Sequence, residues 1–247
     1  MGNWNWKFFL DWDWSFLLDN PGGKIPTYWQ WLMSAWGWTA AVSLCALILA
    51  LAAGSVVGVL RTLSNPLWVR LGGVWVELFR NIPLLVQLFV WQYVLALLPG
   101  LRQLSSFTLM VLALGLFTSA RVAEQVRSGV QALPRGQRHA AMALGLSTPQ
   151  TYRYVLLPMA YRIILPPLTS ESMNVVKNSA VAFAASIPEL AQYFYQVTEE
   201  KSRTKEIFIL VVVLYVITSL IVWAALYWLE RRTRVPGFVG SGAAGGR

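Results

Sequence analysis

The chain has 247 residues, of which 56% are apolar and only 13% are charged. Soluble domains carry about 25% charged residues, so this chain has too little polar surface for a water-soluble fold of its size. The net charge of +9 could indicate nucleic acid, but the basic residues stand in short stretches between apolar runs, where they set the orientation of membrane helices. The composition therefore excludes an ordinary soluble domain and indicates an all-α, polytopic membrane protein that contacts lipid and no nucleic acid.

The N-terminal segment, residues 1–34, is rich in tryptophan, and eight of the 13 tryptophans precede Thr39. Tryptophan is favoured at the boundary between lipid and water. Acidic residues interrupt the segment, so it lacks the uninterrupted apolar stretch of a cleavable signal peptide. We expect residues 4–18 to lie on the outer, periplasmic surface of the membrane. A ligand-stacking role of the tryptophan rings is the alternative.

Five apolar runs are long enough to cross a membrane, which takes about 20 residues per helix. These runs cover residues 35–60, 74–98, 107–126, 161–187 and 207–229. The sequence therefore predicts about five transmembrane helices.

The distribution of Lys and Arg predicts the orientation of these helices. With the N-terminus outside, the inner connections hold 11 Lys and Arg and the outer stretches hold six. Seven of the 11 acids, Glu189 among them, also fall on the outer side. Because cytoplasmic connections carry the excess of positive charge, we expect the N-terminus outside and the C-terminus inside. Residues 233–247 are rich in Gly and Ala and predict a disordered cytoplasmic tail.

A polar stretch, residues 134–160, separates the third and fourth runs. It predicts a short helix that ends at Gly145. Ser147 and Gln150 have the spacing of a capping box, so a second short helix begins there. Pro158 is predicted to end this second helix. An ordinary amphipathic connector would give the same pattern, so the pattern alone leaves two interpretations open.

This stretch resembles the EAA loop of ABC-importer permeases, which has the form E-A-A-x3-G-x9-I-x-L-P. Two alanines precede the glycine at the expected distance, and nine further residues lead to Val-Leu-Leu-Pro. A histidine stands where the family usually has Glu, which puts a salt bridge from that position in doubt. The resemblance implies coupling helices that seat in a groove of an ATP-binding subunit. The residues implied in this coupling are His139, Ala140, Ala141, Gly145, Leu157 and Pro158.

Other motifs narrow the resemblance to polar amino-acid permeases. Residues 77–87 are similar to the E-x-F-R-x-x-P-L-L-V-Q signature of that group, and residues 121–129 and 176–179 also resemble it. The resemblance covers most of the chain and is strongest to the glutamate/aspartate branch. It implies a type I ABC importer permease fold, the MetI-like fold, over residues 35–232, in the bacterial inner membrane.

The resemblance implies a transport subunit and not an enzyme. This subunit would move glutamate or aspartate from a periplasmic binding protein to the cytoplasm by alternating access, paired with a second permease subunit, either a sister chain or another copy. The chain lacks a Gly-x4-Gly-Lys-Ser/Thr loop, so ATP and magnesium are expected on a separate ATP-binding subunit, and no cofactor is expected here. One Cys and one His cannot build a zinc site, so no metal is expected. An importer of glutamine, histidine or arginine stays an alternative, as does an ion-coupled secondary transporter, although no internally repeated halves are visible.

Charges inside the apolar runs are candidates for the substrate pathway, because a charge in a bilayer is costly. Arg121 lies about 21 Å into the third run at 1.5 Å per residue, and Glu124 follows one turn later on the same face. The guanidinium of Arg121 matches a carboxylate, and Glu124 could meet an ammonium group. Two interpretations stay open: the two residues line the pathway, or they pair and hold helices together near the inner interface.

A polar stripe marks the fourth run. Glu171, Asn174 and Asn178 share one helical face, with Lys177 adjacent. Such a stripe faces protein or a water-filled path, so it either lines the pathway or joins helices. Pro166-Pro167 is predicted to kink or delay this helix. The six pathway candidates are Arg121, Glu124, Glu171, Asn174, Lys177 and Asn178.

Overall fold

The computed structural model describes residues 12–23, 25–100 and 103–233. Most of the predicted tail, residues 233–247, lies outside this range, as does the first half of the predicted interfacial segment, residues 4–18. The described residues form helices and no strand, which confirms the all-α prediction. In chain order the elements are η1 (Ser15–Leu18), α2 (Tyr28–Leu60), α3 (Pro66–Asn81), α4 (Leu84–Phe89), η2 (Val90–Val94), η3 (Leu95–Leu97), α5 (Ser106–Gln131), α6 (Arg135–Ala143), α7 (Thr148–Thr151), η4 (Tyr152–Leu156), α8 (Leu157–Asn178), η5 (Ser179–Ala185), α9 (Leu190–Lys201) and α10 (Thr204–Thr233).

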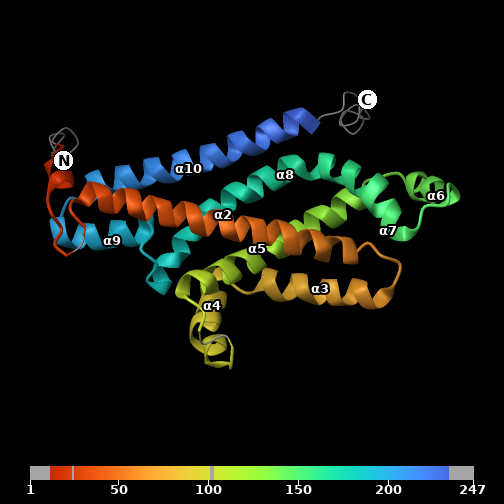
Figure 1. The fold of residues 1–247 in the computed structure, drawn as a ribbon, viewed down its shortest axis with the longest axis horizontal. Coiled ribbons are helices and arrows are strands. Elements are labelled where there is room, and N and C mark those ends of the chain that lie inside the picture. The colour runs from red at the N-terminus through yellow and green to blue at the C-terminus, as the bar shows by residue number, and fades with distance from the viewer. Residues whose placement is uncertain (1–11, 24, 101–102, 234–247) are drawn as a thin grey trace, which may run out of the picture.

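Long helices run along one common direction of the molecule (Figure 1). Helix α9 and the start of α2 lie at one end, α6 and α7 lie at the other, and α10 runs from the first end toward the second. Among the described residues, α2, α5 and α10 are each long and apolar enough to cross a membrane. Helices α3 and α4 with η2 pass the same test together and are bent by 101° at their junction. Helix α8, which carries the polar stripe, is not among them, so the count of five spans and their orientation stay predictions.

The second predicted span differs from a single helix over residues 74–98. Helix α3 begins eight residues earlier, at Pro66, where Asn65 caps it by accepting a hydrogen bond from the N–H of Leu67 at 2.9 Å. It ends before Pro83, because a residue that precedes proline is pushed into an extended conformation, as Ile82 is here. The second predicted run is therefore not one helix, because the chain turns sharply between α3 and α4.

The prolines of the fourth predicted span also act differently from the expectation. Pro158 does not end the second coupling helix, because α7 continues through the π-helix η4 into α8, and Pro158 lies in the first turn of α8. The π-helical turn η4 comes just before Pro158 and interrupts the regular α-helical hydrogen-bond pattern, so a residue without an N–H donor is tolerated there. Pro166 and Pro167 lie inside α8, so the predicted delay of the helix start is wrong.

Helix α5 is the centre of the fold, and α2 packs on it through glycines. A Cβ atom added at Gly54 would lie 2.5 Å from Cβ of Val122 and 2.7 Å from the carbonyl oxygen of Ser119. One added at Gly58 would lie 2.6 Å from Cβ of Val126. Small residues let two membrane helices approach to backbone contact, so these two glycines set the distance between α2 and α5.

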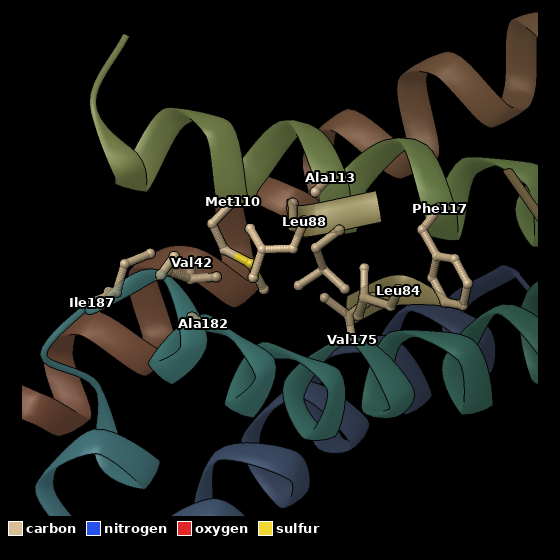
Figure 2. Packing of buried hydrophobic residues seen from close by; sticks show 12 residues of the cluster. Val42, Leu84, Leu88, Met110, Ala113, Phe117, Val175, Ala182 and Ile187 are labelled. Carbon is tan, nitrogen blue, oxygen red and sulfur yellow. The ribbon is translucent and has the colours of Figure 1, made fainter. Parts of the chain in front are cut away.

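The other side of α5 carries a buried apolar cluster that joins four helices. Val42 of α2, Leu88 of α4, Met110 of α5 and Val175 of α8 meet there and are almost fully buried (Figure 2). This cluster holds α4 against the bundle although the following η2 and η3 extend away from it (Figure 1).

Ion pairs join segments that are distant in the sequence at the end of the molecule where α9 lies. Lys201 pairs with Asp19 at 2.7 Å, and Arg203 pairs with Asp13 at 2.6 Å. Phe16 of η1 is buried in an apolar cluster with residues of α2, α9 and α10. The described part of the predicted interfacial segment therefore contacts protein through Asp13 and Phe16, whereas Trp14 and Leu18 are exposed.

Adding one methyl group between α2 and α5 tests this packing. We expect Gly54→Ala to lower the free energy of unfolding by roughly 1–3 kcal/mol, because the new Cβ would overlap α5 and force the helices apart. The matched control is Gly37→Ala in the same helix, where an added Cβ meets no atom within 4 Å. The measurement is the thermal midpoint of each purified variant in detergent. Equal midpoints for both variants would contradict the proposed role of Gly54.

Candidate functional site

Arg121 is the central residue of the candidate pathway, and it bridges α5 and α8. Its Nη1 donates to Oε1 of Glu171 at 3.3 Å, and its guanidinium carbon lies 4.8 Å from the ring centroid of Phe117. The Arg121 side chain is 38% exposed, whereas that of Glu171 is only 10% exposed. Two neighbours therefore orient the guanidinium, while most of its five N–H donors stay available for an external carboxylate.

The polar stripe of α8 is assembled around Glu171. Asn174 donates from Nδ2 to Oε2 of Glu171 at 3.5 Å. Lys177 is exposed, and Asn178 is partly buried at the last position of α8. Of the six pathway candidates, the structure thus joins three in one cluster, Arg121, Glu171 and Asn174. The part each of the six plays in transport stays a prediction.

Glu124 has partners other than the expected Arg121. Its Oε1 accepts a hydrogen bond from Nη1 of Arg61, and its Oε2 lies 3.7 Å from Nη1 of Arg127. Arg61 is the C-cap residue of α2, so the ion pair ties the end of α2 to α5. Since both carboxylate oxygens have a cationic partner, this geometry favours the helix-joining interpretation for Glu124.

Glu189 is a buried acid that the sequence analysis counted among the residues of the outer stretches. It is fully buried and caps α9, accepting hydrogen bonds from the N–H of Gln192 at 2.9 Å and from the hydroxyl of Tyr215 at 2.7 Å. It also lies 3.4 Å from Oγ1 of Thr39. Thr39 is 11 residues into α2, about 16 Å along the helix. The structure therefore buries Glu189 against α2 and α10, and only Pro188 before it signals that a new helix starts there.

The predicted coupling stretch folds into two short helices joined by a turn, as expected. Gly145 has φ +83°, a left-handed conformation that glycine adopts without strain. Ser147 and Gln150 form the predicted capping box at the start of α7. The sequence therefore predicted this local structure correctly, apart from the end of the second helix.

The six coupling candidates have different environments. Ala141 is almost fully buried, and Leu157 is half-buried. The exposed members are His139, Ala140, Gly145 and Pro158.

Exposed apolar side chains surround the turn between α6 and α7. Leu144 is 84% exposed, and Met142 and Tyr154 are also exposed. The same stretch is fastened to the loop after α2, since Tyr152 donates to the carbonyl oxygen of Thr62 at 2.9 Å. The arrangement is an exposed apolar surface on a base that is hydrogen-bonded to the loop after α2.

Comparisons with known proteins agree with this architecture. Residues 50–235 match the family of binding-protein-dependent transport system inner membrane components. The glutamate/aspartate import permease protein GltJ of Escherichia coli strain K12 is 43% identical over 249 residues, which covers 96% of this chain and 98% of that protein. The probable glutamine ABC transporter permease protein GlnM of Bacillus subtilis strain 168 is 34% identical over 196 residues, covering 78% of this chain and 89% of that protein.

Solved structures show the same fold. A crystal structure of an amino acid ABC transporter with histidines superimposes with a TM-score of 0.70 at 29% identity, covering 83% of this chain and 95% of that chain. An inward-facing structure of the MetNI methionine ABC transporter gives a TM-score of 0.73 at 23% identity, which supports the fold alone. This chain therefore belongs to the binding-protein-dependent transport system inner membrane components, the membrane permease subunits of ABC importers.

Proposed function

We propose that this chain is a permease subunit that imports glutamate and aspartate. The observation that carries the proposal is the 43% identity, over nearly the full length of both proteins, with a relative named as a glutamate/aspartate import permease. In the proposed complex, a periplasmic binding protein delivers the amino acid, and ATP-binding subunits consume ATP and magnesium. A second permease subunit completes the membrane part.

The chemistry of Arg121 supports an acidic substrate. A planar guanidinium binds a carboxylate through two parallel hydrogen bonds, and Arg121 is held in place by Glu171 and Phe117 without being enclosed. Glutamate and aspartate each carry one carboxylate more than glutamine. Arg121 is proposed to contact that side-chain carboxylate during transport, and Glu171 to orient Arg121.

The coupling stretch supports an external motor. Leu144 and Met142 expose apolar surface beside the turn at Gly145, and such a surface becomes stable when a partner covers it. The ATP-binding subunit is the proposed partner, with His139 at the position that the family usually fills with Glu. ATP binding would move α6 and α7, and this movement would turn the pathway toward the periplasm.

Helix α4 and η2 support a second membrane subunit. Helix α4 packs on the bundle through Leu88, and η2 extends from it (Figure 1). Their other faces expose Leu85, Phe89 and Tyr93. Interfaces between membrane helices depend on close packing, and a second permease subunit is proposed to pack against this face.

The substrate is tested by uptake into proteoliposomes that hold the complete complex with its binding protein. Labelled glutamate, aspartate, glutamine and arginine are compared at equal concentration. We expect uptake of glutamate and aspartate that requires ATP inside the vesicles. Uptake of glutamine or arginine in their place would make this chain an importer of another polar amino acid.

Removing the guanidinium tests the proposed role of Arg121. We expect Arg121→Gln to lower glutamate and aspartate uptake by about tenfold or more, because a charged hydrogen bond to the substrate carboxylate is lost. Arg121→Lys retains the charge, so we expect its glutamate and aspartate uptake to lie between that of the wild type and that of Arg121→Gln. The control is Arg231→Gln at the exposed, cytoplasmic end of α10, which we expect to transport like the wild type. A purely structural Arg121 would instead leave the ratio of glutamate to glutamine uptake unchanged.

A side chain at Gly145 tests the coupling turn. We expect Gly145→Val to weaken binding of the ATP-binding subunit by about five- to thirtyfold, since a branched residue at φ +83° costs about 1–2 kcal/mol and distorts the turn. Gly136→Ala in α6 is the matched control, because an added Cβ there meets no atom within 4 Å. The measurement is the amount of ATP-binding subunit that co-purifies with each variant. Wild-type co-purification and transport with Gly145→Val would rule out the coupling role.

A further inference from the structure

A basic hollow opens where the C-terminal ends of α2 and α5 meet the first half of α3. Its volume is about 620 Å³, and its lining includes Arg61, Arg70 and Arg127 together with Glu77. A second hollow of about 430 Å³ shares Arg61 and adds other arginines from the coupling stretch. Neither hollow contains any of the pathway candidates.

The arginines of the first hollow are positioned by the fold. The aliphatic part of Arg61 lies against α3 at Gly72, where an added Cβ would come within 2.5 Å of its Cγ. Glu124 binds Arg61 and Arg127 at the same time. Arg70 is exposed and, among the described residues, has no acidic partner within ion-pair distance.

The charge of this region selects an anion. The lining of the first hollow has three arginines and Glu77, and Glu124 pairs with Arg61 and Arg127 from outside the lining. These five side chains together carry one net positive charge. The lining of the neighbouring hollow has Arg135 and Arg138 in addition and no acidic residue. The net charge of the two hollows together is therefore three positive charges. Arginine is the side chain best suited to phosphate, because its planar donors match two phosphate oxygens.

The surroundings of the hollow are apolar, so its ligand has an apolar part as well. Val69 and Val74 line the hollow and are exposed. Trp68 and Leu71 extend the exposed apolar surface on α3, and tryptophan at such a position marks the level of lipid headgroups. A free phosphate ion would leave this surface uncovered, whereas the acyl chains of a phospholipid would cover it.

We infer that this hollow is a binding site for the phosphate headgroup of an anionic phospholipid, with the acyl chains along α3. Basic pockets between membrane helices on the cytoplasmic side commonly bind such headgroups. The inference rests on the cytoplasmic position that the proposed function gives to the ends of α2 and α5. The lipid would link α2, α3 and α5 beside the coupling stretch.

The test is lipid binding to the purified, delipidated complex, measured by native mass spectrometry. Phosphatidylglycerol and phosphatidylcholine with identical acyl chains are added separately. We expect the wild type to retain phosphatidylglycerol over phosphatidylcholine, and Arg70→Gln to reduce this preference by about fivefold, the usual effect of one basic residue near a lipid surface. Arg153→Gln is the matched control, because it removes the same charge from an exposed position of η4 outside the hollow.

A second variant fills the hollow without changing its charge. Gly73 lines the hollow, and an added Cβ there meets no atom within 4 Å, so Gly73→Leu can project into the space and still fold. We expect it to reduce phosphatidylglycerol binding as Arg70→Gln does. Wild-type lipid preference in both variants would overturn the site.

Competition with an excess of inorganic phosphate distinguishes a phospholipid headgroup from a free phosphate ion as the ligand of the hollow. We expect it to displace little of the bound phosphatidylglycerol, because phosphate alone makes no contact with the apolar surface of α3. Complete displacement would overturn the lipid assignment and indicate a site for a soluble anion. Lipid binding is measured without amino-acid substrate, so its failure is distinguishable from a failure of glutamate uptake.

Discussion

The backbone contact between α2 and α5 is the constraint on which the rest of the structure depends. Gly54 and Gly58 have no side chains, so α2 lies against α5 closely enough that a methyl group would overlap Val122 and Val126. Because lipid supplies no hydrophobic force between helices, such close packing is what holds membrane helices together. Helix α5 also carries Arg121, so the same contact fixes the position of the central candidate residue relative to the bundle.

This contact also decides which charges pair. An isolated α5 would place Glu124 near Arg121 by helical spacing alone. In the folded chain, α2 brings Arg61 against Glu124, and α8 brings Glu171 against Arg121. Glu124 therefore pairs with Arg61, and Glu171 pairs with Arg121. The Arg61–Glu124 pair joins the C-terminal end of α2 to α5, and the Arg121–Glu171 pair joins α5 to α8 at the candidate pathway.

Sequence patterns correctly predicted the structural features that depend only on residues close together along the chain. The turn at Gly145 and the capping box that starts at Ser147 follow from spacing along the chain, and both were confirmed. The ion pairs of Arg61 with Glu124 and of Arg121 with Glu171 join residues 63 and 50 positions apart, so spacing could not give them. The burial of Glu189 depends on Thr39 and Tyr215, which are 150 and 26 positions away. Proline was the ambiguous local signal, because the chain turns at Pro83 whereas Pro158 lies within a continuous helical run.

The continuity of the chain after the coupling turn has a mechanical consequence for the proposed function. From Thr148 the backbone stays helical through α7, η4 and α8 to Asn178, without the break that Pro158 was expected to cause. Glu171 lies 13 residues after Pro158, about 20 Å along the same helix. A displacement of α7 by the ATP-binding subunit would therefore reach Glu171 through one continuous helix. Since Glu171 orients Arg121, such a displacement would move the guanidinium without any loop that could absorb it.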